Sequence, residues 1–161
     1  MPSKERAGMT PAYSRNVFIN CPYDRTYVVG MLRPILFTVK LLGFYPRLAM
    51  ESADSGATRI NRIIGLLRKS QYGIHDLSRV RAERRGEHFR LNMPFELGLE
   101  LGCRVFGNSK YRQKRCLVLE KDRYSFQAAL SDLSGSDVCW HNNKPQRAIR
   151  HVGTGSCRRP A

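Results

Sequence analysis

Two carboxylates of this chain stand where they could take part in a reaction on a bound ligand. Glu96 lies in segment 92–98, NMPFELG, which predicts a helix with Asn92 as its N-cap and Glu96 in its first turn. Asp76 ends segment 72–76, YGIHD, which predicts a buried strand. A carboxylate fixed beneath a sugar ring stabilises or traps the oxocarbenium-like charge that develops when an N-glycosidic bond breaks. Glu96 could therefore serve as the key carboxylate of such a reaction, with Asp76 or Asp24 orienting ribose hydroxyls or handling a proton at the base.

Other polar residues follow the predicted strands and could bind the ligand. They are Asn20, Cys21, Pro22 and Asp24 after the first strand, Asp54 and Ser55 after the second, Ser78 and Arg79 after the third, and Asn92 at the helix start. Backbone N–H groups in the turn that begins at Cys21, with the N-terminus of the helix behind it, are suited to hold a phosphate. Arg79 could pair with a phosphate as well. No metal site is predicted, because no histidine stands near a cysteine at zinc-site spacing.

Ordinary structural roles compete with each of these assignments, and the residues alone leave the choice open. A carboxylate in a first turn complements the helix dipole, which would explain Glu96 without any reaction. His75 in an apolar strand is more often a hydrogen-bonded core histidine than a base or ligand. Asp54 and Ser55 more often form a turn and a helix cap. Cys21 is more often a small buried residue than a nucleophile.

The elements that would position these residues alternate between strands and helices. Strands are predicted at 16–20, 44–49, 72–76, 116–119 and 137–140, and helices at 27–42, after a cap within 55–58, after a cap at 92, at 124–133 and from 145. This alternation predicts an α/β domain with a central, mostly parallel sheet of about five strands and helices on both faces. Ligands of such sheets bind beyond the carboxyl ends of the strands, where the polar residues above would gather.

The chain length and the pattern along it predict one domain between two less regular ends. The 161 residues suffice for a single core. Segment 1–15 is polar and is expected to be flexible, whereas 16–152 carries the strand and helix pattern. Segment 153–161 has no periodicity and several helix breakers, which predicts an irregular tail. An apolar face exposed near that tail would favour self-association into a homo-oligomer.

The formal net charge of +15 raises the expectation of a polyanionic partner. The basic residues are dispersed, however, and no segment interleaves aromatic and basic residues or has helix-turn-helix spacing. We therefore expect weak, non-specific binding to nucleic acid rather than sequence recognition.

Composition also bears on the compartment. No apolar run approaches the roughly 20 residues that span a bilayer, and the first 15 residues contain no apolar signal segment. Five cysteines without paired spacing favour a reducing environment over a disulfide framework. These features predict a cytoplasmic protein without membrane association.

Three segments of the chain resemble a family of bacterial proteins of about this length that has no assigned activity. They are 16–24, NVFINCPYD; 72–79, YGIHDLSR; and 92–98, NMPFELG. The resemblance extends from residue 16 to about residue 152. More distantly, the chain is similar to the nucleoside 2-deoxyribosyltransferase-like and TIR-like group, whose members share a flavodoxin-like sheet. Many members of that group cleave N-glycosidic bonds of nucleosides, nucleotides or NAD.

Several positions carry this more distant resemblance. In the deoxyribosyltransferases a helix start of Phe/Glu/Leu/Gly type carries the catalytic glutamate, and segment 95–98 matches it at Glu96. An aspartate typically follows the third strand, as Asp76 does, and segment 21–22 resembles the Gly-Pro or Ser-Pro turn after the first strand. The chain departs from the pattern at 92–94, where those enzymes usually have small residues with Thr or Ser.

The resemblance implies a single flavodoxin-like domain that binds a nucleoside, a nucleotide or NAD as substrate and needs no cofactor. The reaction it implies is hydrolysis or transfer at an N-glycosidic bond. Two other functions stay open. One is a non-catalytic TIR-like nucleotide sensor or interaction module that uses the same cleft, and the other is a basic nucleic-acid-binding protein.

Overall fold

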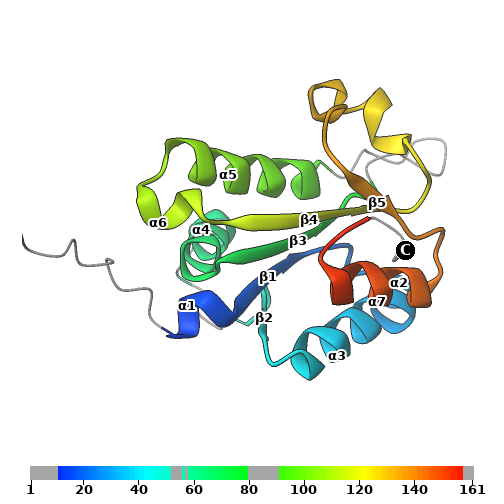
Figure 1. The fold of residues 1–161 in the computed structure, drawn as a ribbon, viewed down its shortest axis with the longest axis horizontal. Helices are drawn as coiled ribbons and strands as arrows, with labels where there is room; N and C mark the ends of the chain where they lie inside the picture. The colour runs from blue at the N-terminus through cyan, green and yellow to red at the C-terminus, as the bar shows by residue number, and fades with distance from the viewer. Residues whose placement is uncertain (1–10, 52–55, 57, 80–90, 158–161) are drawn as a thin grey trace, which may run out of the picture.

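The computed structural model of the chain contains a five-stranded sheet in which every neighbouring pair of strands is parallel (Figure 1). It describes residues 11–51, 56, 58–79 and 91–157. The strands are β1 (Asn16–Asn20), β2 (Tyr45–Leu48), β3 (Tyr72–Asp76), β4 (Arg115–Glu120) and β5 (Val138–Trp140). Their order across the sheet is β2-β1-β3-β4-β5, the order of flavodoxin-like domains. The predicted fold class is therefore confirmed.

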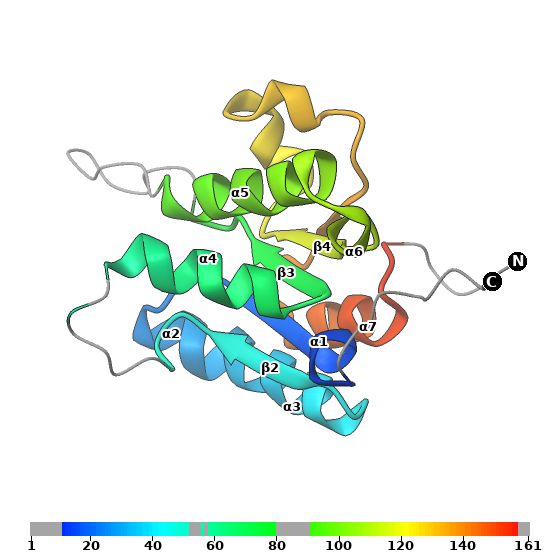
Figure 2. The ribbon, with the colours of Figure 1, turned by 90° about the vertical axis from the view of Figure 1, so that its left-hand side faces the viewer.

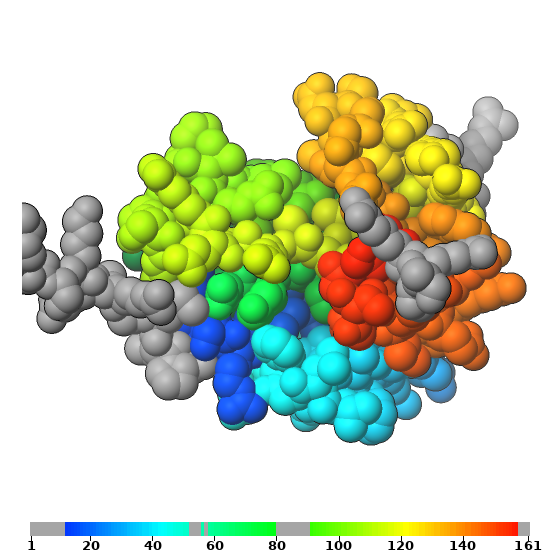
Figure 3. Space-filling model, in the orientation of Figure 1, coloured from blue at the N-terminus to red at the C-terminus, as the bar shows by residue number. Residues whose placement is uncertain are grey.

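Helices cover both faces of this sheet (Figure 2). They are α1 (Pro11–Arg15), α2 (Arg25–Tyr27), the π-helical turn η1 (Val28–Leu32), α3 (Arg33–Leu41), α4 (Arg59–Lys69), α5 (Asn92–Phe106), α6 (Ser109–Arg112), the 3₁₀ turns η2 (Ser125–Ala128) and η3 (Ser131–Leu133), and α7 (Pro145–Thr154). On one face α3 and α7 lie side by side, as Figure 3 also shows, and α4 and α5 cover the other. Among the described residues, no helix combines the length and the apolar character needed to cross a bilayer.

Strand β1 lies in the interior of the sheet and is buried along its whole length. Val17 and Ile19 pack into the core under α3 and α7, whereas Phe18 packs against α4 on the opposite face. This alternation follows from the period of two residues in a strand. The packing on both faces fixes the position of the strand, and its last residue, Asn20, lies at the carboxyl edge of the sheet.

The predicted helix 27–42 is interrupted by a π-helical turn rather than by a simple kink at its proline. The turn η1 ends directly before α3, in which Pro34 is the second residue. Proline has no N–H to donate to the carbonyl one turn earlier, and a wider turn accommodates the missing hydrogen bond. The helix ends at a glycine stop as predicted, since Gly43 has a φ of +81°.

Helix α4 turns a slightly different face to the sheet than its spacing predicts. The i, i+3, i+4, i+7 spacing of its apolar residues selects Ile60, Ile63, Ile64 and Leu67, but the buried residues are Ile63, Leu66 and Leu67. Ile64 is 37% exposed. The apolar residues of this helix cover an arc wider than the surface offered by the sheet, so one edge of the arc stays in solvent.

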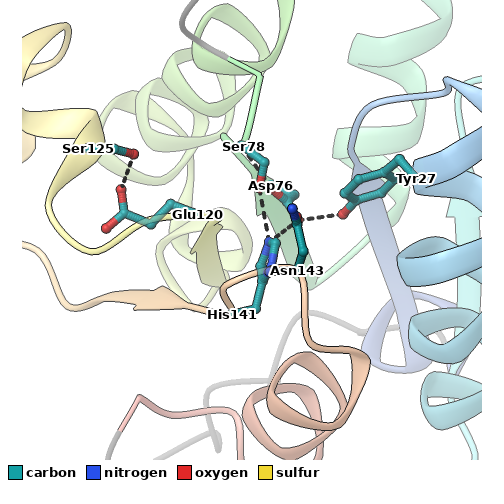
Figure 4. Close-up of polar contacts among 7 residues, drawn as sticks. All are labelled: Tyr27, Asp76, Ser78, Glu120, Ser125, His141 and Asn143. Atoms are coloured by element: carbon teal, nitrogen blue, oxygen red, sulfur yellow. Dashed lines mark hydrogen bonds and ion pairs between the residues drawn. The ribbon is translucent and has the colours of Figure 1, made fainter. Parts of the chain in front are cut away.

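The prediction of a helix at 124–133 is wrong, because two short 3₁₀ turns occupy this segment. The buried carboxylate of Glu120 accepts hydrogen bonds from the backbone N–H groups of Tyr124 and Phe126 and from the Ser125 hydroxyl (Figure 4). Tyr124 has a φ of +64°, outside the helical region. The positive φ of Tyr124 thus keeps the first residue of the predicted helix out of the helical conformation, and the hydrogen bond to Glu120 holds its N–H group in place.

Both ends of the predicted domain extend further than expected. Residues 11–15, predicted as part of a flexible segment, form α1, and the side chain of Tyr13 is buried. At the other end α7 continues to Thr154 and stops at Gly155, which has a φ of +61°. The expectation of unpaired cysteines is wrong for one pair, since a disulfide joins Cys139 of β5 to Cys157. Their separation of 18 residues matches no motif that a sequence scan would detect.

Candidate active site

A cleft of about 580 Å³ lies at the carboxyl end of β1, beside the start of α5. Its lining residues are Asn20, Cys21, Pro22, Tyr23, Asp24, Arg59, Leu91, Asn92, Met93 and Glu96. Six of the predicted site residues therefore line one cleft, although they come from two segments that are some 70 residues apart in the sequence. The strands β1 and β3 are parallel and end at the same edge of the sheet. Helix α5 begins at that edge too, which brings the two segments together.

Helix α5 begins one residue earlier than predicted, and this moves Glu96 out of the first turn. Asn92 is the first helical residue rather than the N-cap, and the preceding Leu91 offers no side-chain cap. Glu96 is thus the fifth residue of the helix. Because the dipole effect falls off within the first turn, dipole complementation explains little of why a carboxylate stands here.

The Glu96 side chain is almost completely buried at the wall of the cleft, and in the part of the chain that the structure describes it pairs with Arg59. Its exposed fraction is 4%, and Nη2 of Arg59 lies 3.7 Å from Oε1. Burial raises the pKa of Glu96 above the ordinary glutamate value, and the positive charge of Arg59 offsets this only in part. A carboxylate held in this way is poorly solvated, which increases its affinity for a positive charge that develops nearby.

A chain of buried polar groups lies behind the cleft wall. The amide of Asn20 donates to the carbonyl oxygen of Met93 at 2.9 Å and lies 3.0 Å from Nδ1 of His75. Since this amide is a donor, Nδ1 accepts and the ring proton resides on Nε2, which lies 2.6 Å from Oε2 of Glu100. His75 is thus a hydrogen-bonded core residue, and Asn20 joins the end of β1 to the start of α5.

Glu100 has a second buried partner besides His75, and a glycine of β3 leaves space for its carboxylate. Nζ of Lys114 lies 3.0 Å from its Oε1. Burial alone would raise the pKa of Glu100, but the hydrogen bond from His75 and the charge of Lys114 lower it below the ordinary value. A Cβ atom at Gly73 would lie 2.8 Å from the carboxylate carbon of Glu100, which accounts for a glycine at this position of β3.

Asp76 lies outside this cleft, completely buried at the end of β3 (Figure 4). Its carboxylate accepts hydrogen bonds from the Tyr27 hydroxyl, from the backbone N–H and hydroxyl of Ser78, and from Nε2 of His141, which lies 3.1 Å away. Burial alone would raise the pKa of Asp76, but these hydrogen bonds lower it. They tie the end of β3 to α2 and to the segment after β5.

The Asp76, Ser78 and His141 side chains do not form a catalytic triad. The backbone N–H of Asn143 donates to Nδ1 of His141 at 3.1 Å, so the ring proton resides on Nε2. That same nitrogen faces both Asp76 and the Ser78 hydroxyl, which is 2.9 Å away. A triad histidine instead uses one nitrogen for each partner. Asp76 and Ser78 thus hold strand ends together and do not line the cleft, so the catalytic role of Asp76 and the ligand-binding role of Ser78 stay predictions.

The remaining predicted residues fall at the rim of the cleft or outside the described chain. Asp24 caps α2 by accepting a hydrogen bond from Tyr27, and its second oxygen lies 3.5 Å from Nε of Arg79. Arg79 therefore lies at the rim beside Asp24. Asp54 and Ser55 lie outside the described residues.

Cys21 lines the cleft but does not have the properties of a nucleophile. Its side chain is 2% exposed, and burial raises the pKa of the thiol far above its ordinary value. Nearby carboxylates add to this effect. The thiol is therefore protonated at neutral pH, as expected for a small buried residue.

Arg59 and His141 are among the residues of this region that were not predicted. Arg59 is the first residue of α4, directly after the cap Thr58, so its place near the carboxyl edge could have been inferred from the predicted cap. His141 directly follows β5, and the rule that selected the polar residues after the other strands would have selected it too. The described residues contain no group of three or more His, Cys, Asp or Glu placed to hold a metal ion.

Comparison with models of known protein families gives no match, and comparison with curated proteins gives none either. The relationship indicated by the three segments therefore stays a prediction. The functional argument rests on the cleft and on the environment of Glu96.

Proposed function

We propose that the cleft binds a nucleoside, a nucleotide or NAD, and that Glu96 promotes cleavage or transfer at its N-glycosidic bond. One observation carries the proposal: the carboxylate of Glu96 lies at the wall of a cleft of about 580 Å³. Its side chain is only 4% exposed, and Arg59 is its neighbour. The cleft also lies at the carboxyl edge of a parallel sheet, where α/β domains bind ligands.

The reaction begins with departure of the base from C1′ of the sugar. The C1′–N bond breaks, its electron pair leaves with the base, and positive charge develops on the ring. The ionised Glu96 stabilises that charge or forms a bond to C1′. Water then attacks C1′ and loses a proton in hydrolysis, or the nitrogen of a second base attacks in transfer, and Glu96 is regenerated.

The other polar residues of the cleft have roles in holding the substrate. Asp24 has a side chain that is 28% exposed and could accept hydrogen bonds from the hydroxyl groups of a ribose. Arg59 is about half exposed and reaches the same wall as Glu96, so it could pair with a phosphate of a nucleotide. Asn20 stabilises the wall of the cleft through the hydrogen bond that its amide donates to the carbonyl oxygen of Met93.

The direct test is an incubation of the purified protein with NAD and a panel of nucleosides and nucleotides, followed by chromatographic detection of released base. Base release that is lost in Glu96→Gln supports the proposal. Asp122→Asn is a matched control, because it converts an exposed carboxylate outside the cleft into an amide. Full turnover by Glu96→Gln would show that the mechanism is wrong.

The ion pair between Glu96 and Arg59 also suits a binding protein that causes no turnover. In that alternative the pair holds the cleft in shape, and the ligand is released unchanged. Ligand binding by both the parent protein and Glu96→Gln, with no base released by either, would favour a nucleotide sensor or interaction module.

A further inference from the structure

The charges of this molecule are distributed unevenly along the direction of its strands. Segments 58–75 and 101–119, which include α4, α6, β3 up to His75 and most of β4, contain no Asp or Glu. Six cationic side chains from these segments lie toward the amino ends of the strands: Arg68, Lys69, Arg104, Lys110, Arg112 and Arg115. We call this set the basic pole. In Figure 2, α6 and the end of α4 lie to the right, away from the side on which α4 and α5 begin and the cleft lies.

Contacts between distant segments assemble the basic pole. Nε of Arg68 at the end of α4 lies 3.4 Å from the hydroxyl oxygen of Tyr111 in α6. Nζ of Lys110 lies 4.2 Å from the ring centroid of Tyr13, and the Tyr13 hydroxyl donates to the Lys110 carbonyl oxygen. Aromatic and basic residues are thus brought together from three segments. Segment 104–115 contributes four of the six cations, and α4 contributes the other two.

Helix dipoles explain only part of the basic pole. Arg68, Lys69 and Arg104 stand in the last turns of α4 and α5, where positive charge is favourable. The other three cations belong to the single-turn helix α6, whose dipole is small, or to the start of β4. The nearest acidic side chain in the sequence, Glu100, is buried and paired with Lys114, so it does not offset them. A surface of this kind attracts a polyanion.

An exposed aromatic ring lies at the same end of the molecule. Phe106, the last residue of α5, is 90% exposed, and Val105 beside it is 60% exposed. An aromatic side chain among cations is the combination that binds single strands, since phosphates meet the cations while a base stacks on the ring. In a duplex the bases are already stacked on each other and cannot use the ring.

We propose that the basic pole binds single-stranded nucleic acid, with its cations on the phosphates and Phe106 against a base. This function is separate from the reaction proposed for the cleft, because the two sites lie at opposite ends of the sheet. Either can fail without the other. RNA and single-stranded DNA share the chemistry that the surface recognises.

The experiment measures fluorescence anisotropy of labelled 20-nucleotide RNA, single-stranded DNA and duplex DNA with the full chain, over a range of salt concentrations. Arg104→Glu with Arg112→Glu is the test variant. Arg33→Glu with Arg150→Glu is the matched control, since all four side chains are exposed and each pair lowers the formal net charge by the same amount. Phe106→Ala tests stacking, and its exposure makes a folding defect unexpected.

We expect a single strand to bind with an affinity that falls steeply with salt. The test variant should bind about tenfold or more weakly and show a smaller salt slope, by roughly 0.7 for each phosphate that the protein no longer neutralises. Phe106→Ala should weaken binding by about fivefold or more with an unchanged slope. The RNA and DNA arms then show which strand is preferred.

Three results would overturn the proposal. Equal weakening by the test and control pairs would mean that only net charge matters. Tighter binding of duplex than of single strands, with no effect of Phe106→Ala, would rule out stacking. Sedimentation with phosphatidylserine vesicles, without binding to any oligonucleotide, would identify the partner as an anionic membrane.

Discussion

Glu96 and Asp76 are both buried carboxylates at the carboxyl edge of one sheet, yet their surroundings differ in kind. Asp76 receives four hydrogen bonds and has no exposed surface. Within the described residues, Glu96 has one cationic partner, at 3.7 Å, and it faces a cleft. Burial raises the pKa of Glu96, whereas in Asp76 the hydrogen bonds outweigh burial and lower it. The number of donors around a carboxylate therefore separates a positioning group from one available for chemistry.

The largest effect on stability is expected from Asp76→Asn. An amide of the same size places an N–H group where the carboxylate accepts hydrogen bonds from Tyr27, Ser78 and His141. Loss of bonds to a buried charged group costs about 3 kcal/mol of unfolding free energy. Denaturant unfolding monitored by circular dichroism measures this cost. A change below about 0.5 kcal/mol would mean that the hydrogen bonds of Asp76 do not hold the strand ends together.

A somewhat smaller loss of stability is expected from Gly73→Ala. The added methyl group would overlap the carboxylate of Glu100 and displace it from His75. We expect a cost of about 2 kcal/mol, typical of overpacking in a core. Gly98→Ala is the control, because a Cβ atom there meets no other atom within 4 Å. Equal unfolding midpoints for the two variants would contradict the close packing of Glu100 on β3.

The pH dependence of stability should differ from that of activity. Asp76 and Glu100 have lowered pKa values in the folded state, so the stability they contribute is present above the unfolded carboxyl pKa of about 4 and is lost as the pH falls through their folded values. Glu96 has a raised pKa, so on acidification its reactive ionised form disappears at a higher pH than theirs. Activity should therefore decline at a pH where the protein is still folded.

Parallel measurements of base release and of circular dichroism between neutral and acidic pH check this order. A rate that falls only together with the folded signal would mean that Glu96 does not limit the reaction.

The sign of the Glu96 shift has a further consequence. Since its ionised form is disfavoured by burial, Glu96→Gln should leave stability unchanged or increase it at neutral pH.

The smallest effect is expected from Arg59→Ala. The guanidinium is about half exposed, so its interaction with a substrate phosphate is weakened by solvent and is worth about 1 kcal/mol, or roughly fivefold in KM. The loss should appear with nucleotides and not with nucleosides. Arg59→Lys should restore part of it. Equal effects on both substrate classes would mean that Arg59 acts on Glu96 rather than on a phosphate.

The fold was predictable because strand patterns, turn signals and helix stops are local properties of the sequence. Segments 16–20 and 72–76 are short apolar runs that end in polar residues, and their parallel pairing follows from the helices between them. The same logic brought Asn20 and Glu96 to one edge. What failed depended on side-chain contacts that the spacing does not reveal, as at 124–133, where the carboxylate of Glu120 accepts hydrogen bonds from the N–H groups of Tyr124 and Phe126.

The candidate site shows the same limit. Sequence spacing places Asp76 and Glu96 at the same edge. It cannot reveal that His141, 65 residues beyond Asp76, donates a hydrogen bond to the Asp76 carboxylate. Likewise, the spacing does not show that α5 begins at Asn92, with Leu91 in the cap position. Side-chain partners that come from other elements thus determined which predicted residues face the cleft.

The central claim is that Glu96 is available for chemistry and Asp76 is not. The most direct measurement is base release from the best substrate of the panel by Glu96→Gln and by Asp76→Asn, each at a temperature where circular dichroism shows it to be folded. We predict that Glu96→Gln loses about a hundredfold or more in kcat, whereas folded Asp76→Asn keeps most of it. The reverse pattern, with Glu96→Gln active and folded Asp76→Asn inactive, would contradict the account.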